Sequence, residues 1–261
     1  MNAQVRRRID GLLRPRVVLA YHGVASAPAS KTDEGADPHR LLVDPARLES
    51  QLRYLLRLGY DVRSADDLVG SVTPVPATAV LTFDDGWHDG VTTVMPMLER
   101  LGTTATFFVC PGWFGGCHPE VRGDEARLLT EDDIAVLVQH GMSVGSHSMS
   151  HRDLRTLDDA TLRADLRESK ALIEAATQRP CRLFAYPYGL FDERVERAVE
   201  DAGYEAAFAW SPERWSAEPW RRFAIPRLPA PPRNGARRLA LKLILRARKP
   251  HVSFTWPTRS Q

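Results

Sequence analysis

The sequence predicts an α/β fold in which a core of parallel strands is covered by helices. Short apolar runs of strand length alternate with longer segments whose apolar residues recur at helical spacing, and this alternation is typical of parallel sheets. The chain has 261 residues, of which 43% are hydrophobic and 26% charged, as in an ordinary soluble domain. This length suits one large domain that buries most of its apolar surface in a single core.

The N-terminal half of the chain contains the clearest strand signals. The apolar run over 17–21 predicts a buried strand, and the run over 78–83 predicts another. Between them, leucines recur at helical spacing from Pro45 until Gly59, which predicts a helix. The other elements expected in this half are a loop over 24–44, a strand over 61–63, a helix over 65–68, a helix over 91–101 and a strand over 104–109.

The C-terminal half continues the alternation. Thr130 followed by Asp133 is a capping-box pattern, which predicts the start of a helix that ends near His140 and Gly141. The other elements expected in this half are a strand over 142–146, a helix over 158–177, a strand over 182–186, a helix over 192–202 and a strand over 204–209.

The domain boundaries follow from changes in composition. The alternation becomes irregular after Pro212, and the Pro-rich stretch 226–232 marks the edge of the domain. Basic residues gather at both ends of the chain. We therefore expect a basic N-terminal segment over 1–16, one domain over 17–233 and a basic C-terminal segment over 234–261.

Charge and targeting signals exclude several classes of protein. The formal net charge is +2, so nothing global favours a nucleic-acid partner. The N-terminus has no apolar run of signal-peptide length, and no stretch approaches the ~18 apolar residues of a membrane helix, so we expect a cytoplasmic protein without a membrane span. The basic C-terminal segment can contact anionic lipid, although a solvated face is the simpler interpretation. Three cysteines in this length do not indicate a disulfide framework.

Polar residues directly follow three of the expected strands. Asp84 and Asp85 follow one strand, His147 follows another, and the Pro-Tyr-Gly turn over 187–189 follows a third. In α/β barrels and open α/β sheets, active sites lie at the carboxyl ends of strands. These three loops are therefore expected to converge on one pocket.

Asp84 and Asp85 form an adjacent pair of carboxylates before Gly86, which allows a tight turn. Like charges repel, so such a pair is costly unless something stabilises it. Neighbouring side chains of an extended chain point to opposite faces, so one carboxylate can bind a metal while the other faces water or substrate. Taken alone, Asp-Asp-Gly is an ordinary turn sequence.

His147 and His151 lie four residues apart. Imidazole is the usual zinc ligand, and this spacing suits one metal that takes a third ligand from elsewhere. In isolation, two solvated histidines of a polar loop explain the pattern equally well. Together with the Asp pair, they supply two histidines and one carboxylate, which leave positions open for water and substrate. Three other histidines have no partner at ligand spacing: His88, His118 and His140.

These motifs resemble those of a known family. Thr82–Gly86 and His147–His151 resemble the first two motifs of the polysaccharide deacetylase family, also called the NodB-homology or carbohydrate esterase 4 family. The resemblance is closest to the branch that deacetylates poly-N-acetylglucosamine, and it extends over roughly residues 17–229. Further segments that carry it are Tyr21-His22, 51–55 with Gly59-Tyr60, 184–189, 202–204 and 226–228.

The resemblance implies a distorted (β/α) barrel with a parallel strand core and outer helices. It also implies that Asp85, His147 and His151 bind a divalent metal, with zinc expected and cobalt or nickel as alternatives. Asp84 would act as general base, and the backbone N–H of Tyr188 would help to stabilise an oxyanion. These roles agree with the chemistry, because a metal makes an amide carbonyl more electrophilic and a carboxylate can take a proton from water.

The sequence departs from the broader family at three places. Ala185 stands where many members carry an arginine that orients the base, no acidic residue precedes Trp210 in the expected motif, and no histidine lies near Arg227. Other residues must then orient the base and protonate the leaving group. We expect Arg227 to orient Asp84 and His22 to deliver the proton; a structural role for His22 beneath the site is the alternative.

The sequence therefore predicts a metal-dependent hydrolase that removes N-acetyl groups from an N-acetylated sugar in a polysaccharide, oligosaccharide or glycan precursor. One alternative is a related metal-dependent amidase that acts on a small or cyclic amide. Another is a non-catalytic carbohydrate-binding protein that keeps the fold. Trp113 is a candidate for lining a sugar-binding cleft, whereas Trp210 is expected in the core.

Overall fold

The strands in the described part of the chain form one sheet. The computed structural model describes residues 16–24, 41–70, 77–121, 123–210, 221–230 and 239. Over these ranges the strands are β1 Val17–Tyr21, β2 Asp61–Arg63, β3 Thr78–Phe83, β4 Thr106–Val109, β5 Ser143–Ser146, β6 Leu183–Ala185, β7 Ala206–Ala209, β8 Ile225–Pro226 and β9 Leu228–Pro229.

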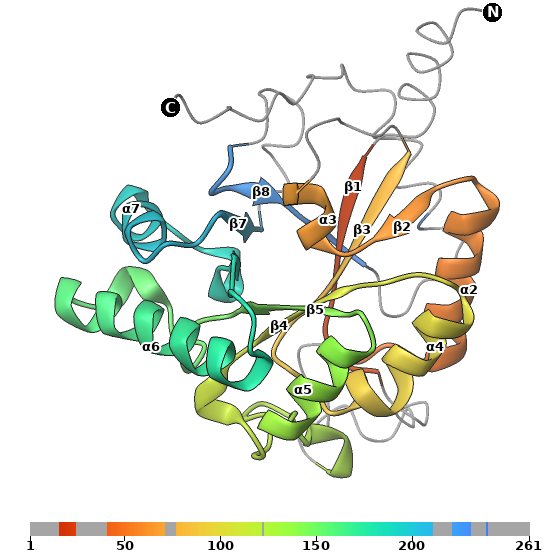
Figure 1. The fold of residues 1–261 in the computed structure, drawn as a ribbon, viewed down its shortest axis with the longest axis horizontal. Coiled ribbons are helices and arrows are strands. Elements are labelled where there is room, and N and C mark those ends of the chain that lie inside the picture. The colour runs from red at the N-terminus through yellow and green to blue at the C-terminus, as the bar shows by residue number, and fades with distance from the viewer. Residues whose placement is uncertain are drawn as a thin grey trace, which may run out of the picture.

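The sheet is parallel and almost closes on itself. Its order is β8-β7-β6-β5-β4-β3-β1-β9, with β2 pairing to β3. Only Arg227 separates β8 from β9, yet β8 pairs with β7 and β9 pairs with β1, at opposite ends of this order. The described strands therefore nearly close into a barrel, and the predicted (β/α) barrel is confirmed (Figure 1).

Helices surround the strands, as Figure 1 shows. They alternate with the strands along the chain, as the sequence predicted. The helices are α2 Pro45–Arg57, α3 Ala65–Gly70, α4 Met95–Arg100, α5 Glu131–Gln139, α6 Asp159–Thr177 and α7 Glu193–Asp201, with short π-helical or 3-10 turns η1 Gly90–Val94, η2 Pro111–Trp113, η3 Asp124–Ala126, η4 Leu154–Thr156 and η5 Pro187–Gly189.

Side-chain caps explain where the longer helices begin. Asp44, Asp158 and Asp192 accept hydrogen bonds from backbone N–H groups in the first turns of α2, α6 and α7. At α5, Thr130 and Asp133 cap each other's backbone N–H groups, so the predicted capping box is confirmed. The first N–H groups of a helix otherwise lack partners, and a cap of this kind contributes about 1 kcal/mol.

Alternate strand residues pack on two sides of the sheet. One set of alternate residues faces outward and packs against the helices, for example Leu19 with the leucines of α2. The other set faces inward and forms a separate buried cluster that the strands enclose. This inner cluster contains Val18, Val80, Phe108, Leu183, Ala185, Ala206, Phe208 and Ile225, together with residues of α3.

Gly145 on β5 lies against the inner ring of Phe108. A Cβ at Gly145 would lie 2.6 Å from Phe108 Cε1 and 3.0 Å from the carbonyl oxygen of Leu183. Gly145→Ala is therefore expected to lower the free energy of unfolding by about 1–3 kcal/mol, measured by urea denaturation, because the ring or the strand must shift. Phe108→Leu in the same background should recover part of the loss. Unchanged stability of Gly145→Ala would contradict this packing.

Some element boundaries differ from the prediction. The helix expected over 91–101 begins with the π-helical turn η1. The strand expected over 104–109 begins only at Thr106, because the backbone N–H of Thr103 still bonds back to the carbonyl of Leu98 at the end of α4. Strands β8 and β9 were not predicted, since two residues ending in proline are too short to show a periodic pattern.

Several predictions concern residues outside the described ranges. The basic segments over 1–16 and 234–261 lie almost entirely outside them, as does most of the loop over 24–44. The domain boundaries, the membrane contact of the C-terminal segment and the cellular location therefore stay predictions. Among the described helices, none combines the length and the apolar character needed to cross a membrane. The three cysteines are free thiols, with Cys110 and Cys181 buried and Cys117 exposed.

Candidate metal and catalytic site

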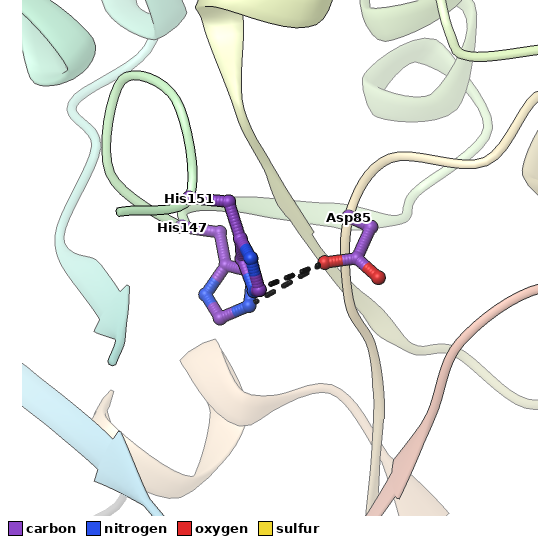
Figure 2. A group of neighbouring side chains, drawn as sticks. All are labelled: Asp85, His147 and His151. Carbon is purple, nitrogen blue, oxygen red and sulfur yellow. Dashed lines mark ion pairs between the residues drawn. The ribbon is translucent and has the colours of Figure 1, made fainter. Parts of the chain in front are cut away.

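Three loops meet at the carboxyl end of the sheet. Asp84 and Asp85 follow β3, the loop that carries His147 and His151 follows β5, and Tyr188 lies in η5 after β6. Asp85 Oδ1 lies 3.6 Å from His147 Nε2 and 3.5 Å from His151 Nε2 (Figure 2). The structure thus brings together the two histidines and the carboxylate that the sequence indicated.

Unusual backbone conformations gather in these loops. Six described residues other than glycine have a positive φ, and four of them are Asp85, Ser148, His151 and Tyr188. Such conformations cost energy and persist only where the surrounding structure enforces them. Their concentration at one place is typical of a functional site, where side-chain position takes precedence over local backbone energy.

His147 is oriented through its second ring nitrogen. Its Nδ1 lies 2.7 Å from the carbonyl oxygen of Ala185 at the end of β6. A carbonyl oxygen can only accept, so Nδ1 carries the proton of the neutral ring and the Nε2 lone pair is directed toward Asp85. Histidines that bind metals in proteins are commonly fixed in this manner.

His151 is neutral at neutral pH. Burial, and then the charge of His147, lowers the pKa of His151 to about 4. Its backbone N–H donates to Ser148 Oγ at 3.0 Å, and its ring packs edge-on against Tyr188 at 4.5 Å. An unprotonated imidazole held in this position offers a lone pair to a metal.

Asp85 provides the test of whether a cation fits. Its Oδ1 is buried without a hydrogen-bond partner, which is costly for a carboxylate oxygen. Burial raises the pKa of Asp85, but the contact with His118 and the charges of the other nearby histidines outweigh it and hold this pKa below its usual range. Tetrahedral zinc ligands about 2.0–2.2 Å from the ion lie about 3.3–3.6 Å apart, which matches the separations of Asp85 from both histidines. The three residues therefore fit a divalent metal.

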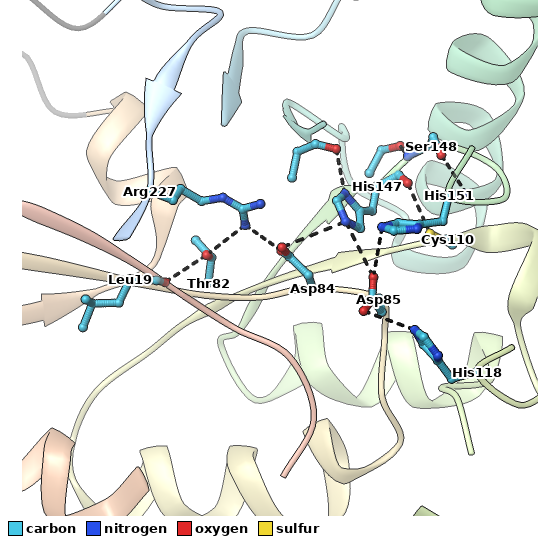
Figure 3. A network of polar contacts seen from close by, with 12 residues as sticks. Leu19, Thr82, Asp84, Asp85, Cys110, His118, His147, Ser148, His151 and Arg227 are labelled. Carbon is cyan, nitrogen blue, oxygen red and sulfur yellow. Dashed lines mark hydrogen bonds and ion pairs between the residues drawn. The ribbon is translucent and has the colours of Figure 1, made fainter. Parts of the chain in front are cut away.

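Asp84 lies between His147 and Arg227 (Figure 3). Arg227 Nη1 donates to Asp84 Oδ1 at 2.6 Å and to Thr82 Oγ1 at 3.2 Å, and all three side chains are buried. Burial raises the pKa of Asp84, but the charge of Arg227 and of the nearby histidines His147 and His22 outweighs it and lowers this pKa. Asp84 is thus held ionised, the state in which a carboxylate can accept a proton.

Replacing Arg227 with leucine is expected to lower the free energy of unfolding by about 3–5 kcal/mol, because the buried carboxylate of Asp84 loses its partner. Urea denaturation measures this change. Adding Asp84→Asn to Arg227→Leu should restore part of the stability, since no charge then stays buried alone. A single Arg227→Leu variant as stable as the wild type would show that the pair is not buried as described.

His22 and Tyr188 lie at the edge of the site. His22 directly follows β1 and is half-buried, and its charge helps to lower the pKa of both Asp84 and Asp85. Tyr188 is 52% exposed and has a left-handed backbone beside Gly189, where a Cβ would lie 2.3 Å from the backbone nitrogen of Trp210. The proton-delivery role of His22 and the oxyanion role of Tyr188 stay predictions.

The surroundings predicted for Trp210 and Trp113 can be compared with those in the structure. Trp210 was expected in the core, but it is 40% exposed because it comes directly after the end of buried strand β7. Trp113 is half-buried and its ring lies 5.5 Å from that of His151 and 5.4 Å from that of His118. The tryptophan predicted to line a sugar cleft therefore borders the candidate metal site.

Among the described residues, His118 is the one buried histidine near the site that the sequence did not indicate. Its Nε2 lies 3.4 Å from Asp85 Oδ2. It belongs to an irregular segment between β4 and α5, and it is far from Asp85 in the sequence. Neither a ligand-like spacing nor a preceding strand marks it, so only the folded chain could place it here.

Comparisons with known proteins identify the family. A sequence model described as polysaccharide deacetylase matches residues 71–207, just over half of the chain. The protein YxkH of Bacillus subtilis is 25% identical over 199 residues, covering 75% of this chain and 64% of that protein. A chitooligosaccharide deacetylase of Bradyrhizobium sp. is 30% identical over 152 residues, covering 57% of this chain and 61% of that protein. The chain thus spans less than two thirds of either curated relative.

Two solved structures share the fold. The deacetylase PplD of Streptococcus pyogenes, solved in complex with acetate, superposes with a TM-score of 0.72 at 20% identity over 87% of this chain and 97% of that chain. IcaB from Ammonifex degensii superposes with a TM-score of 0.68 at 20% identity over 88% of this chain and 97% of that chain. At this identity the likeness concerns the fold alone. The family assignment rests on the sequence model, and on that basis the chain belongs to the polysaccharide deacetylase family.

Proposed function

We propose that this protein is a metal-dependent hydrolase that removes N-acetyl groups from an N-acetylated sugar in a polysaccharide, oligosaccharide or glycan precursor. The observation that carries the proposal is the buried Asp85 Oδ1, which has no hydrogen-bond partner and faces His147 and His151. Beside it, Asp84 is held ionised by Arg227. Membership of the polysaccharide deacetylase family supports the same class of reaction.

The chemistry divides between the metal ligands and their neighbours. A divalent metal bound by Asp85, His147 and His151, for which we propose zinc with cobalt or nickel as alternatives, supplies Lewis acidity that makes an amide carbonyl more electrophilic and water more acidic. Asp84 accepts the proton of the attacking water, and Arg227 fixes the carboxylate in the orientation that this transfer requires.

Two residues at the edge of the site complete the proposed reaction. The backbone N–H of Tyr188 donates to the oxyanion that forms when water adds to the carbonyl, and its left-handed backbone supports a fixed, preorganised donor. His22 gives a proton to the departing amine of the sugar. Its place after β1, near Asp84 and Asp85, supports this assignment.

The surroundings of the site support a carbohydrate as substrate. Trp113 and Tyr188 flank His151 with their rings, and Tyr188 is largely open to solvent. Aromatic faces suit the apolar faces of sugar rings, while the polar groups of the site recognise the amide. The Bradyrhizobium relative is named a chitooligosaccharide deacetylase, which makes N-acetylglucosamine oligomers the first substrates to examine.

Acetate release from a panel of substrates tests the proposal. The panel comprises chitooligosaccharides, poly-N-acetylglucosamine oligomers, monomeric N-acetylsugars and small cyclic amides, each with chelator and with zinc, cobalt or nickel added back. We expect acetate release from at least one glycan, lost with chelator and restored by metal. Opening of cyclic amides without acetate release would assign the amidase function instead. Glycan binding by calorimetry without turnover would assign a non-catalytic role.

A further inference from the structure

The segment between β4 and α5 carries His118 to the side of Asp85 that faces away from His147 and His151. The imidazole of His118 is buried, and its Nε2 lies 3.4 Å from Asp85 Oδ2 (Figure 3). The other oxygen, Asp85 Oδ1, faces the two metal-binding histidines. The two oxygens of one carboxylate therefore have separate surroundings.

The tautomer of His118 follows from its second contact. The backbone N–H of Glu120 donates to His118 Nδ1 at 3.2 Å. Because a backbone N–H can only donate, Nδ1 must be unprotonated, and the proton of the neutral ring lies on Nε2. His118 therefore donates through Nε2 to Asp85 Oδ2 and cannot offer a lone pair there.

The ring of His118 is held in place on several sides. It stacks on Trp87 with ring centroids 4.6 Å apart and an interplanar angle of 14°, and it meets Trp113 edge-on at 5.4 Å. Its backbone N–H bonds to the carbonyl of Ala126 at 2.7 Å. Trp87 packs in turn in a small apolar cluster with Val121, Ala126 and Leu128. This packing prevents the imidazole from rotating away from Asp85.

We propose that His118 is a positioning residue for the metal ligand Asp85. By donating to Oδ2, it would keep the carboxylate from turning and leave Oδ1, which faces His147 and His151, free to bind a metal. This inference rests on the proposed metal-dependent function. Partners of this kind typically change metal affinity by 10–100-fold, because they fix a ligand before the metal arrives.

Two variants of His118 separate donation from packing. His118→Phe keeps an aromatic ring on Trp87 but removes the donor. His118→Gln loses the ring but keeps an N–H donor at a similar reach. We measure the zinc dissociation constant of the full chain by competition with a chromophoric chelator. His118→Phe is expected to bind zinc about 10–100-fold more weakly than the wild type, and His118→Gln close to the wild type.

Control variants define what each outcome means. His140→Gln removes an exposed histidine outside the site and should bind zinc as the wild type does. Asp85→Ala should lose zinc affinity more severely than either His118 variant. Urea denaturation of the metal-free proteins shows that each variant is folded.

Two results would overturn the proposal in different ways. If His118→Phe binds zinc like the wild type while Asp85→Ala does not, the metal site stands and His118 does not position it. If, in addition, His118→Gln binds zinc more weakly than the wild type, the ring of His118 has a packing role only. If the wild type and Asp85→Ala bind zinc equally, the proposed metal site is itself wrong, and the role of His118 falls with it.

Discussion

Replacing Asp84 with asparagine is expected to slow acetate release by about 10²–10⁴-fold, because an amide cannot accept the proton of the attacking water. The expected loss lies in kcat rather than KM, since Asp84 acts on the water and not on the sugar. Asparagine keeps an oxygen that can accept from Arg227 Nη1, which now bonds Asp84 Oδ1. The variant should therefore fold and bind zinc, although at reduced stability because the charge of Arg227 stays buried.

Steady-state kinetics of acetate release, together with the zinc content of the purified variant, measure this effect. Asp201→Asn is the matched control, because Asp201 is an exposed carboxylate at the end of α7. It should leave kcat unchanged. An Asp84→Asn protein with wild-type kcat would rule out Asp84 as the base, whereas the metal site would still stand.

Replacing His151 with alanine should weaken zinc binding by more than about 100-fold, since even the partners of metal ligands change affinity by 10–100-fold. His151 is suited to binding because burial keeps its imidazole neutral, with a pKa of about 4. Its Nε2 also lies 3.5 Å from Asp85 Oδ1. Acetate release at a limiting zinc concentration should fall with the fraction of metal bound.

Zinc affinity of His151→Ala is compared with that of His140→Ala, in which the exposed histidine that pairs with Glu99 is removed. The control should bind zinc as the wild type does. A high zinc concentration should restore part of the activity of His151→Ala if the loss is one of affinity. Wild-type affinity in His151→Ala would exclude this histidine from the ligand set.

The grouping of Asp85, His147 and His151 could be predicted from the sequence because its signals are local. Asp85 and His147 each follow an apolar run that is itself a recognisable strand, and parallel strands place their carboxyl ends together. His151 lies four residues from His147, so one loop delivers both rings. These features need no knowledge of which strands are neighbours.

Arg227 shows where sequence reasoning needed the structure. The absence of an arginine at Ala185 indicated that another residue must orient Asp84, and Arg227 was the residue expected, but no pattern marks the two short strands on either side of it. The structure shows that these strands join the two ends of the sheet and bring Arg227 within 2.6 Å of Asp84. Closure of a barrel depends on pairing between distant strands, which leaves little trace in local periodicity.

The place of His118 beside Asp85 was not predicted, and the core position predicted for Trp210 was wrong, for a related reason. His118 lies in an irregular segment whose fold depends on contacts with Trp87 and with the backbone of Ala126. Trp210 follows a buried strand, and its size suggested the core, but β7 ends at Ala209 and the side chain of Trp210 is 40% exposed. In both cases the surroundings of the side chain depend on long-range packing rather than on the neighbouring sequence.

The central claim is that Asp85, His147 and His151 bind the metal on which hydrolysis depends, with Asp84 as the base. Its most direct test is the rate of acetate release while metal-free protein is titrated with zinc, on the best glycan of the panel. We predict that the rate rises in proportion to added zinc, levels off at one equivalent per chain, and stays near zero in Asp84→Asn throughout. Acetate release at the full rate in the presence of excess chelator would contradict the claim.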